Sequence, residues 1–511
     1  MSPRSANRYW GGDGLRRGPT DLAAWLGAWI FSVLVLTAAS PAAADTGYFA
    51  GTEGARPAGR AGAFVAKADD VSALMVNPAG LAALDGTRVQ VGNRFSYNFY
   101  AYHRAGTLDW GRATDGIAPR ATFSTSYNQE PWQLLDPLVG ITTDFGLEDW
   151  GFGISIQAPA GTAKERFPVD GGQRYMMVSR TAEILNYTVG AAYKYKDRFG
   201  IGASLVWIDV PKLRYQLVID GSKFPRDANP VSSELDMLAT VSGSDRFTPN
   251  AVLGTWYRPT PYLQIGLSGQ IVPTSIETHS RLAVDPTSPE IDENVQLYRN
   301  GTPADDVRLT LPLPVTVRTG IRYLHHRRKR ELFDVELDAV YESWSRVDRF
   351  RLRSNQLIAT LLGERLDIDR IDVNKHWNDT VTLQLGSDVV VIDQRLIARG
   401  GLFYQTALAD PAYANVDFVS GRQLGGALGA SVFIERLELA VAYEFRYQPP
   451  VRIAERDARV FQQTPGSLCE PPYTDVNTCN EHYLGQPAPA ANAGTYRAHS
   501  HVLEVDLLYR L

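Results

Sequence analysis

The sequence predicts an all-β protein, a 14-stranded antiparallel transmembrane β-barrel with a small N-terminal hatch inside the lumen. Three observations predict this fold class. Apolar and polar residues alternate with a period of two after residue 86, the expected connections alternate between short and long, and a Gly/Ala-rich segment precedes the first strand. We therefore expect a signal peptide at residues 1–44, the hatch at 45–86 and the barrel at 87–511.

The first 44 residues are typical of a secretory signal. Four arginines among the first 17 residues precede an apolar run at 22–39, and Ala42-Ala43-Ala44 provides an A-x-A cleavage site before Asp45. A signal anchor is the alternative, because the segment is longer than the usual ~15–30 residues. Export followed by barrel formation predicts a location in the cell outer membrane of Gram-negative type.

Charge and composition exclude some classes of partner. The chain has 51 Lys and Arg against 56 Asp and Glu, a net charge of −5, so nucleic acid is not an expected partner. No run after residue 44 approaches the ~18 apolar residues of a membrane helix, so no helical span is expected. Cys469 and Cys479 are expected to form a disulfide in an exported protein, with two free thiols as the alternative.

The strands are predicted from alternation. In residues 333–341 most odd positions are large and apolar, whereas positions 334, 336 and 338 carry Asp or Glu, and segments 381–386, 437–448 and 503–511 follow a similar pattern. Each is a strand with one apolar and one polar face. The expected strands are 87–102, 137–145, 150–160, 175–195, 199–219, 236–257, 262–283, 306–323, 331–354, 377–391, 395–405, 422–434, 437–448 and 496–511.

The connections favour a membrane barrel over a soluble sandwich. Short gaps such as 146–149, 196–198 and 435–436 alternate with long ones such as 103–136 and 449–495. Outer-membrane barrels have short periplasmic turns at one rim and longer loops at the other, and they close because lipid cannot satisfy a free strand edge. Interfacial girdles are expected from the strand-end aromatics Trp150, Trp256, Tyr257, Trp344, Trp377, Tyr447 and Tyr509.

The hatch is predicted from size and composition. Residues 45–86 contain 18 Gly or Ala among 42 residues and show no sustained period. A piece of this size rarely supports a core of its own, so we expect it to plug the lumen, with its small residues packed against the charged inner wall. A disordered periplasmic leader is the alternative.

The same segment carries a family resemblance. GRAGAFVAKADDVSALMVNPAGLAAL (59–84) resembles the hatch of the FadL/TodX family of outer-membrane transporters, with Asn77, Pro78 and Ala79 at its Asn-Pro-Ala motif, and 311–350 and 377–410 are also similar to that family. The resemblance implies a fourteen-strand barrel closed by a hatch, and a transporter of long-chain fatty acids or aromatic hydrocarbons. It also implies lateral release through a kink in the third strand. The chain ends in Leu511, where such strands more often end in Phe.

The residues also predict where an apolar cargo would bind and leave. Ligand contacts are expected from Phe64, Leu74, Met75, Val76 and Leu81 in the hatch, and from Leu357, Ile358, Leu361 and Leu362 in a segment expected to form an amphipathic helical turn. Packing onto the barrel rim is the alternative for the second group. A lateral opening is expected beside Gly151 and Gly153 of the third strand, with Pro159 toward its outer end, unless the glycines serve only curvature.

No catalytic residue, metal site or cofactor is predicted. The eight histidines fall mostly in loops, turns or near strand ends, and neither a metal-ligand spacing nor G-x-S-x-G occurs, so the protein is not expected to be an enzyme. A passive porin for polar solutes is the alternative function, because the expected lumen is charged. The expected partners are outer-membrane lipids, a hydrophobic small-molecule substrate and, for insertion, the barrel-assembly machinery; the chain is expected to be a monomer.

Overall fold

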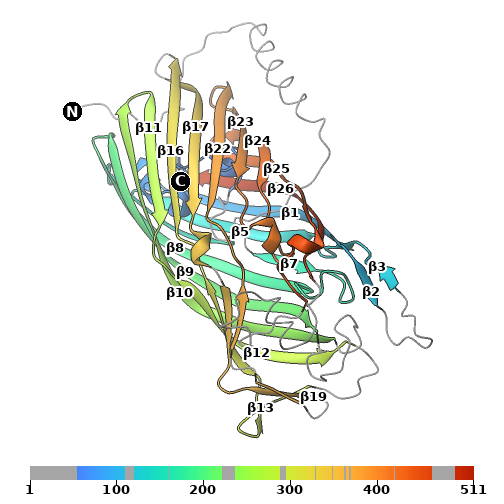
Figure 1. Cartoon of the computed structure of the whole chain (residues 1–511). Coiled ribbons are helices and arrows are strands. Elements are labelled where there is room, and N and C mark those ends of the chain that lie inside the picture. Colours follow the sequence, from blue (N-terminus) through green and yellow to red (C-terminus); the bar gives the residue numbers. More distant parts are fainter. Residues whose placement is uncertain are drawn as a thin grey trace.

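A closed β-barrel is the main feature of the structure (Figure 1), a computed structural model. It describes residues 54–109, 120–159, 162–220, 236–287, 295–327, 330–347, 349–361, 364–367, 370–418, 420–462 and 490–511. The first strand, β1 (Arg88–Arg104), pairs with the last, β26 (Gly494–Arg510), and with β5 (Trp132–Thr143) on its other side. The sheet therefore closes on itself.

Fourteen antiparallel strands form this barrel, as predicted. After β1 and β5 they are β6 (Trp150–Gln157), β8 (Ser179–Tyr195), β9 (Phe199–Ile219), β10 (Met237–Thr260), β11 (Leu263–Gln270), β16 (Thr316–Arg327), β17 (Arg330–Glu342), β22 (Thr380–Ile392), β23 (Leu396–Gln405), β24 (Gln423–Ile434), β25 (Leu437–Ile453) and β26. On the long-loop side, after short stretches that are not strand, the wall continues as four further strands. They are β12 (Ser275–Pro286), β15 (Asp306–Pro312), β18 (Arg349–Arg353) and β21 (Arg370–Asn374).

Short elements lie among the long connections. They are β2 (Thr107–Asp109), β3 (Arg120–Thr122), β4 (Ser126–Tyr127), β7 (Ala163–Arg166), β13 (Gln296–Arg299), β14 (Thr302–Pro303), β19 (Ile358–Leu361), β20 (Glu364–Asp367), and the 3-10 turns η4 (Trp344–Arg346), η5 (Pro411–Tyr413) and η6 (Glu455–Asp457). One expectation is wrong here: residues 358–361 form a strand, because β13 and β20 pair with it on both sides.

The barrel exposes its apolar face and buries its charged face. On β26, Leu503 and Leu507 are over 40% exposed, whereas Glu504 and Asp506 between them are buried in the lumen. A soluble protein shows the reverse, so the outer face is suited to lipid.

The predicted girdle is right only in part. Trp150, Tyr257 and Tyr509 are exposed on the outer face and Tyr447 is half-buried, but Trp256, Trp344 and Trp377 are buried. Trp256 faces inward because its indole Nε1 donates to the carbonyl of Ala79, 2.9 Å away inside the lumen. Trp344 and Trp377 pack against each other edge to face, with their ring centroids 5.2 Å apart.

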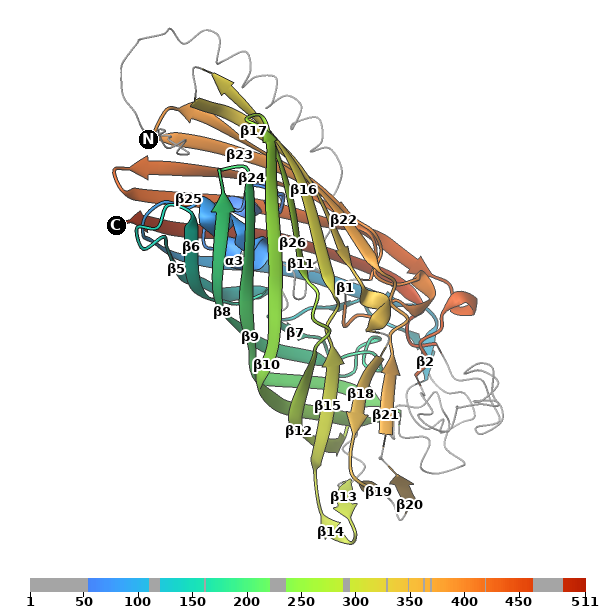
Figure 2. The same ribbon diagram turned by 90° about the vertical axis from the view of Figure 1, so that its left-hand side faces the viewer.

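Residues 54–86, here called the inner segment, lie inside the barrel. They comprise α2 (Ala55–Ala58), α3 (Ala73–Val76), η2 (Pro78–Ala83) and the turns between them, and Figure 2 shows α3 enclosed by the strands. Almost every residue from 54 to 84 is buried. None of the helices in the described ranges has the length and apolarity to cross a membrane.

Candidate transport site

Carboxylates on the inner wall hold two basic side chains of the inner segment. Arg60 Nη1 lies 2.6 Å from Asp334 Oδ1 on β17 and 2.7 Å from Asp388 Oδ1 on β22. Arg60 Nη2 lies 2.9 Å from Glu336 Oε2, and Lys67 Nζ lies 2.9 Å from Asp334 Oδ2. All five side chains are buried, so losing one charge takes an ion-pair partner from each buried group that it contacts, at a cost of about 3–5 kcal/mol. This network fixes the inner segment on one side of the lumen.

The backbone of the inner segment is bound to the same strand. The amides of Phe64 and Val65 donate to Asp338 Oδ2 at 2.7 and 2.8 Å, and the amide of Ala66 donates to Glu336 Oε1 at 2.6 Å. Bonds from amides to carboxylates are stronger than bonds between neutral groups. The acidic face of β17 therefore binds both the main chain and the side chains of the inner segment.

Asn77 links the inner segment to itself and to the wall. Its Nδ2 donates to the carbonyl of Val65 at 2.8 Å and to that of Thr255 on β10 at 3.1 Å, while its Oδ1 accepts from the amide of Ala79 at 3.3 Å. Its backbone is extended, with φ −159°, as the position before Pro78 favours. Pro78 then begins η2. The Asn-Pro-Ala motif thus has a structural role at the contact between segment and wall.

Glycines of the wall make room for this contact. A Cβ at Gly401 would lie 2.3 Å from the carbonyl carbon of Arg60, and a Cβ at Gly202 would lie 2.5 Å from the amide nitrogen of Ala79. A side chain at either position would therefore displace the backbone of the inner segment. Small residues in the wall, as well as those in the segment, allow the close packing.

Asn77→Ala is expected to loosen the inner segment without unfolding the barrel. The substitution leaves the buried carbonyl of Val65 and the partly buried carbonyl of Thr255 without the Nδ2 donor, and a buried unsatisfied group costs about 1–3 kcal/mol. Limited proteolysis of the purified protein in detergent should cut within residues 54–86 faster than in wild type. Asn355→Ala, at an exposed outer position, is the matched control; equal cleavage of both variants would contradict the role of Asn77.

Beyond the inner segment the lumen wall becomes apolar. We define the inner apolar cluster as Met75, Ala182, Ile184, Val206, Ile208, Val210, Leu213, Val252, Ile276 and Leu313, all buried. Met75 comes from the inner segment. The others come from β8, β9, β10 and β12, and from the short non-strand stretch between β15 and β16. The lumen thus has a charged zone filled by the inner segment and an apolar zone next to it.

A second cluster of buried apolar residues lies on the long-loop side of the barrel. It joins Tyr102 of β1 and Tyr496 of β26 to a buried stretch that includes Tyr175, Met176 and Met177. Next to it, Arg174 Nε lies 2.8 Å from Asp236 Oδ2. Burial raises the pKa of Asp236 to about 6, although the Arg174 guanidinium acts in the opposite direction.

The barrel with its enclosed segment, charged zone and apolar zone is matched by a known protein family. The family model described as outer membrane protein transport protein (OMPP1/FadL/TodX) matches residues 34–458. The chain belongs to this family. FadL/TodX proteins are outer-membrane transporters of hydrophobic compounds rather than enzymes, so this chain is placed in the Gram-negative outer membrane.

Solved structures show the same fold. A FadL homologue from Pseudomonas aeruginosa is 16% identical, with a TM-score of 0.67 over 91% of this chain and 100% of that one. The toluene transporters TodX from Pseudomonas putida and TbuX from Ralstonia pickettii are each 13% identical with a TM-score of 0.55, over 86% and 90% of this chain and 94% and 98% of theirs. At these identities the likeness concerns the fold alone. No curated protein sequence matches the chain.

In this FadL/TodX protein, the five hatch residues that were predicted to contact a ligand lie in three different apolar clusters. Phe64 packs with Val65 and Val76, and Leu74 and Leu81 pack against the wall near Leu138 and Ala192. Of the hatch residues, Met75 alone belongs to the inner apolar cluster.

The ligand contacts predicted outside the hatch fall at residues 357–362, in β19 and directly beside it. Leu357 is buried in a cluster with Met237, Leu282 and Val284, whereas Ile358 is half-buried at the start of β19, which ends at Leu361. Leu362, Cys469 and Cys479 lie outside the described residues. Of the expected contacts that the structure describes, Met75 is therefore the one that belongs to the apolar zone.

The predicted opening beside Gly151 and Gly153 coincides with an intact part of the wall. Gly153 pairs with Thr142 on β5 and with Gly190 on β8, and Gly151 pairs with Ala192 on β8. A Cβ at Gly151 would lie 2.1 Å from the carbonyl oxygen of Leu81, so this glycine makes room for the inner segment. The ladder to β5 ends at Gln157, two residues before Pro159. Gly153 is therefore paired on both sides, whereas Gly151 is paired on the β8 side, and an opening elsewhere along this strand stays a prediction.

The wall residues of the inner apolar cluster were missed by the sequence analysis. Their signal is a loss of alternation: Leu205-Val206-Trp207-Ile208 is apolar on both faces of β9. A strand buried on both faces reads as a continuous apolar run, so one that faces lipid outside and an apolar lumen inside shows the same pattern. Such runs distinguish the apolar zone from the charged zone, where alternation is strict.

Proposed function

We propose that this FadL/TodX protein takes up hydrophobic compounds, either long-chain fatty acids or aromatic hydrocarbons, and releases them sideways through the barrel wall. The observation that carries the proposal is the inner apolar cluster, which lines the lumen next to the inner segment. The names of the structural relatives, a FadL homologue and toluene transporters, support the same class of cargo.

Transfer energies favour the apolar zone over the charged one. A hydrocarbon gains about 0.8 kcal/mol for each methylene that leaves water for an apolar site. It gains nothing comparable beside Asp334, Glu336 and Asp388, whose charges are already paired with the inner segment. A straight path through the lumen would break this network, whereas a sideways path leads from the apolar zone into lipid. Capture at the loops and lateral release therefore fit the two zones.

Uptake and conductance together test the proposal. Gram-negative cells that lack their own transporter should accumulate radiolabelled oleate or toluene faster when they express this chain than with an empty vector. The purified protein should be silent in planar bilayers. A large steady current, with no gain in uptake, would instead support a passive porin for polar solutes.

Ile208→Asn is expected to weaken uptake through the apolar zone. Ile208 lies in the inner apolar cluster, and burial of a side chain of this size contributes about 1.5–3 kcal/mol, so the half-saturating concentration should rise about tenfold or more. Leu205→Asn, on the opposite, lipid-facing side of β9, is the matched control. Equal uptake by the two variants, at equal amounts of folded barrel, would contradict a role for the cluster in transport.

A further inference from the structure

The loop between β23 and β24 folds into the barrel. We call residues 414–418 of this loop the tip segment. Val416 is 0% exposed and Asp417 is 1% exposed. Within the tip segment the amide of Asp417 donates to Asn415 Oδ1 at 3.2 Å, and Asn415 and Phe418 form an isolated antiparallel bridge. The tip segment is therefore a compact, buried turn.

The tip segment reaches the opposite wall of the barrel. Arg180 Nη1 of β8 donates to the carbonyl of Asp417 at 3.0 Å, and the hydroxyl of Tyr215 on β9 donates to Asp417 Oδ2 at 3.3 Å. Among the fourteen barrel strands β8 and β9 are the fourth and fifth, whereas β23 and β24, which carry the loop, are the eleventh and twelfth. The two pairs therefore lie on opposite sides of the closed wall, and the tip segment crosses the lumen between them.

Two other parts of the wall hold the tip segment at its sides. Lys375 Nζ, in the connection between β21 and β22, forms an ion pair with Asp417 Oδ2, and both side chains are buried. The hydroxyl of Tyr100 on β1 donates to the carbonyl of Asn415 at 3.0 Å. The tip segment is therefore bound to several sides of the lumen at once.

Apolar contacts surround the tip segment as well. Val416 belongs to the second cluster, together with Tyr496 of β26. The ring of Phe418 lies edge to face against the indole of Trp377, with the ring centroids 4.8 Å apart. The guanidinium carbon of Arg180 lies 5.1 Å from the centroid of the Phe418 ring, within the range of a cation–π contact. Both apolar and charged side chains of the surrounding wall and loops thus pack against the tip segment.

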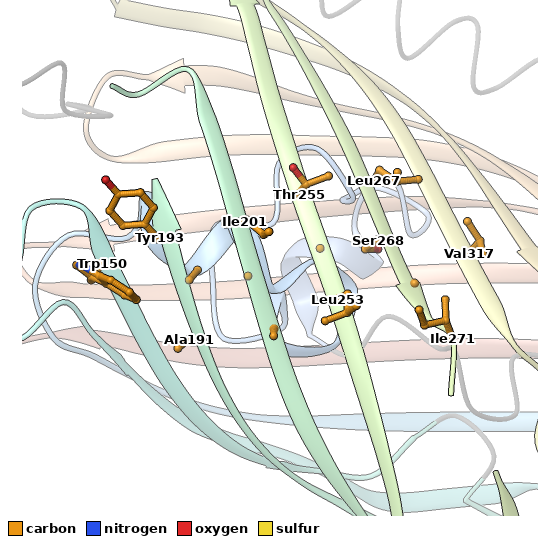
Figure 3. A pocket seen from close by; sticks show the side chains of 15 residues that line it. Trp150, Ala191, Tyr193, Ile201, Leu253, Thr255, Leu267, Ser268, Ile271 and Val317 are labelled. Carbon is orange, nitrogen blue, oxygen red and sulfur yellow. The ribbon is translucent and has the colours of Figure 1, made fainter. Parts of the chain in front are cut away.

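Strand β9 gives the order of these features along the lumen. Near its short-turn end a Cβ at Gly202 would lie 2.5 Å from the inner segment, and Figure 3, centred on a groove of about 580 Å³ in the outer face, shows the inner segment behind β8, β9 and β10. Farther along come the cluster residues Val206, Ile208, Val210 and Leu213. Tyr215, which binds the tip segment, follows two residues later toward the long loops. The inner apolar cluster therefore lies between the inner segment and the tip segment.

We propose that the tip segment is an outer gate, which closes the inner apolar cluster toward the long loops and is held shut by the ion pair between Asp417 and Lys375. The inference rests on the proposed function and adds an opening step before the cargo reaches the cluster. The contacts of Val416 are apolar, so a hydrophobic cargo can take their place when the gate opens. The ion pair is the contact that resists opening, because both charges are buried and each depends on the other.

Thiol labelling tests the gate without any cargo. The background carries Cys469→Ser and Cys479→Ser, and Leu213→Cys then places a single thiol in the inner apolar cluster. A membrane-impermeant maleimide, added to Gram-negative cells that express the chain, should label this thiol slowly while the gate is closed. Asp417→Asn removes the ion pair with Lys375, so labelling of Leu213→Cys should become at least about tenfold faster. Mass spectrometry measures the labelled fraction over time.

Two controls separate opening of the gate from a general loosening of the loops. Asp305→Asn removes a carboxylate from an exposed ion pair with Arg281, with the two charged groups 4.0 Å apart, and should leave the labelling rate of Leu213→Cys unchanged. Arg456→Cys, at an exposed position in η6, should react at the same rate with and without Asp417→Asn. Equal labelling of Leu213→Cys with and without Asp417→Asn, at equal amounts of folded barrel, would overturn the gate.

Labelling of Val416→Cys gives a second measurement that keeps the ion pair intact. Val416 is buried in the tip segment, so Val416→Cys should be labelled slowly in resting cells and faster once oleate is added. No acceleration in cells that do accumulate oleate would contradict the gate but leave the proposed function standing. Cells that accumulate no oleate would remove the proposed function, whereas the labelling of Leu213→Cys with and without Asp417→Asn would still decide whether the gate exists.

Discussion

Replacing Arg60 by methionine is expected to make the closed barrel conduct ions. Methionine keeps much of the volume of the side chain but leaves Asp334, Glu336 and Asp388 without the guanidinium that all three contact. Breaking a buried network in this way costs about 3–5 kcal/mol. The barrel strands keep their ladder bonds, so the loss should fall on the inner segment. Planar-bilayer recordings should then show steady currents that wild type lacks.

Two further variants make this result interpretable. Arg330→Met removes the first residue of β17 from an exposed pair with Asp393, which follows β22, and should leave the bilayer silent. Without Arg60, Asp334 and Asp388 still have Lys67 as a partner at 2.9 and 3.4 Å, whereas Glu336 loses its 2.9 Å ion pair, so adding Glu336→Gln to Arg60→Met should restore part of the closure. If Arg60→Met gives folded barrels that stay silent and resist proteolysis within residues 54–86, the ion-pair network does not hold the segment in place.

The positions of the strands and the charged inner face could be predicted from the sequence. Apolar and polar side chains must alternate along a strand that faces lipid on one side and a charged lumen on the other. Residues 333–341 therefore indicated both the lipid-facing apolar positions and the inward carboxylates of Asp334, Glu336 and Asp338. The alternation of short and long connections followed from the same topology. These properties depend on neighbours in the chain and on the membrane, which is why a single sequence reveals them.

The apolar zone and several contacts between distant segments could not be predicted in the same way. Trp256 was expected at the membrane surface but faces the lumen, because its partner is the carbonyl of Ala79, far away in the sequence. The residues 358–361 formed a strand because residues 296–298 offered them a partner. Along its length β10 pairs first with β12 and then with β11, in registers that differ by one residue. Each depends on contacts between distant segments, for which local periodicity carries no signal.

Alanine substitutions at Gly151 and Gly153 of β6 are expected to have different effects, although both positions lie on the same face of the strand. A Cβ at Gly151 would meet the carbonyl oxygen and carbon of Leu81 at 2.1 and 2.3 Å, so Gly151→Ala must displace the backbone of the inner segment. A Cβ at Gly153 would lie 3.3 Å from the side-chain ends of Leu74, Leu81 and Thr142, which can move slightly. Gly151→Ala should therefore expose the inner segment to protease and raise ion conductance, whereas Gly153→Ala should resemble wild type.

The comparison separates two roles for these glycines. If they marked a lateral gap, a methyl group at either position would reduce oleate uptake and leave the inner segment protected, because both would narrow the same opening. If they accommodate the inner segment, Gly151→Ala alone changes proteolysis and conductance. Uptake, proteolysis and bilayer current measured on both variants distinguish these outcomes. The intact pairing of Gly153 with Thr142 and Gly190 favours the second, since a paired strand leaves no opening for a methyl group to close.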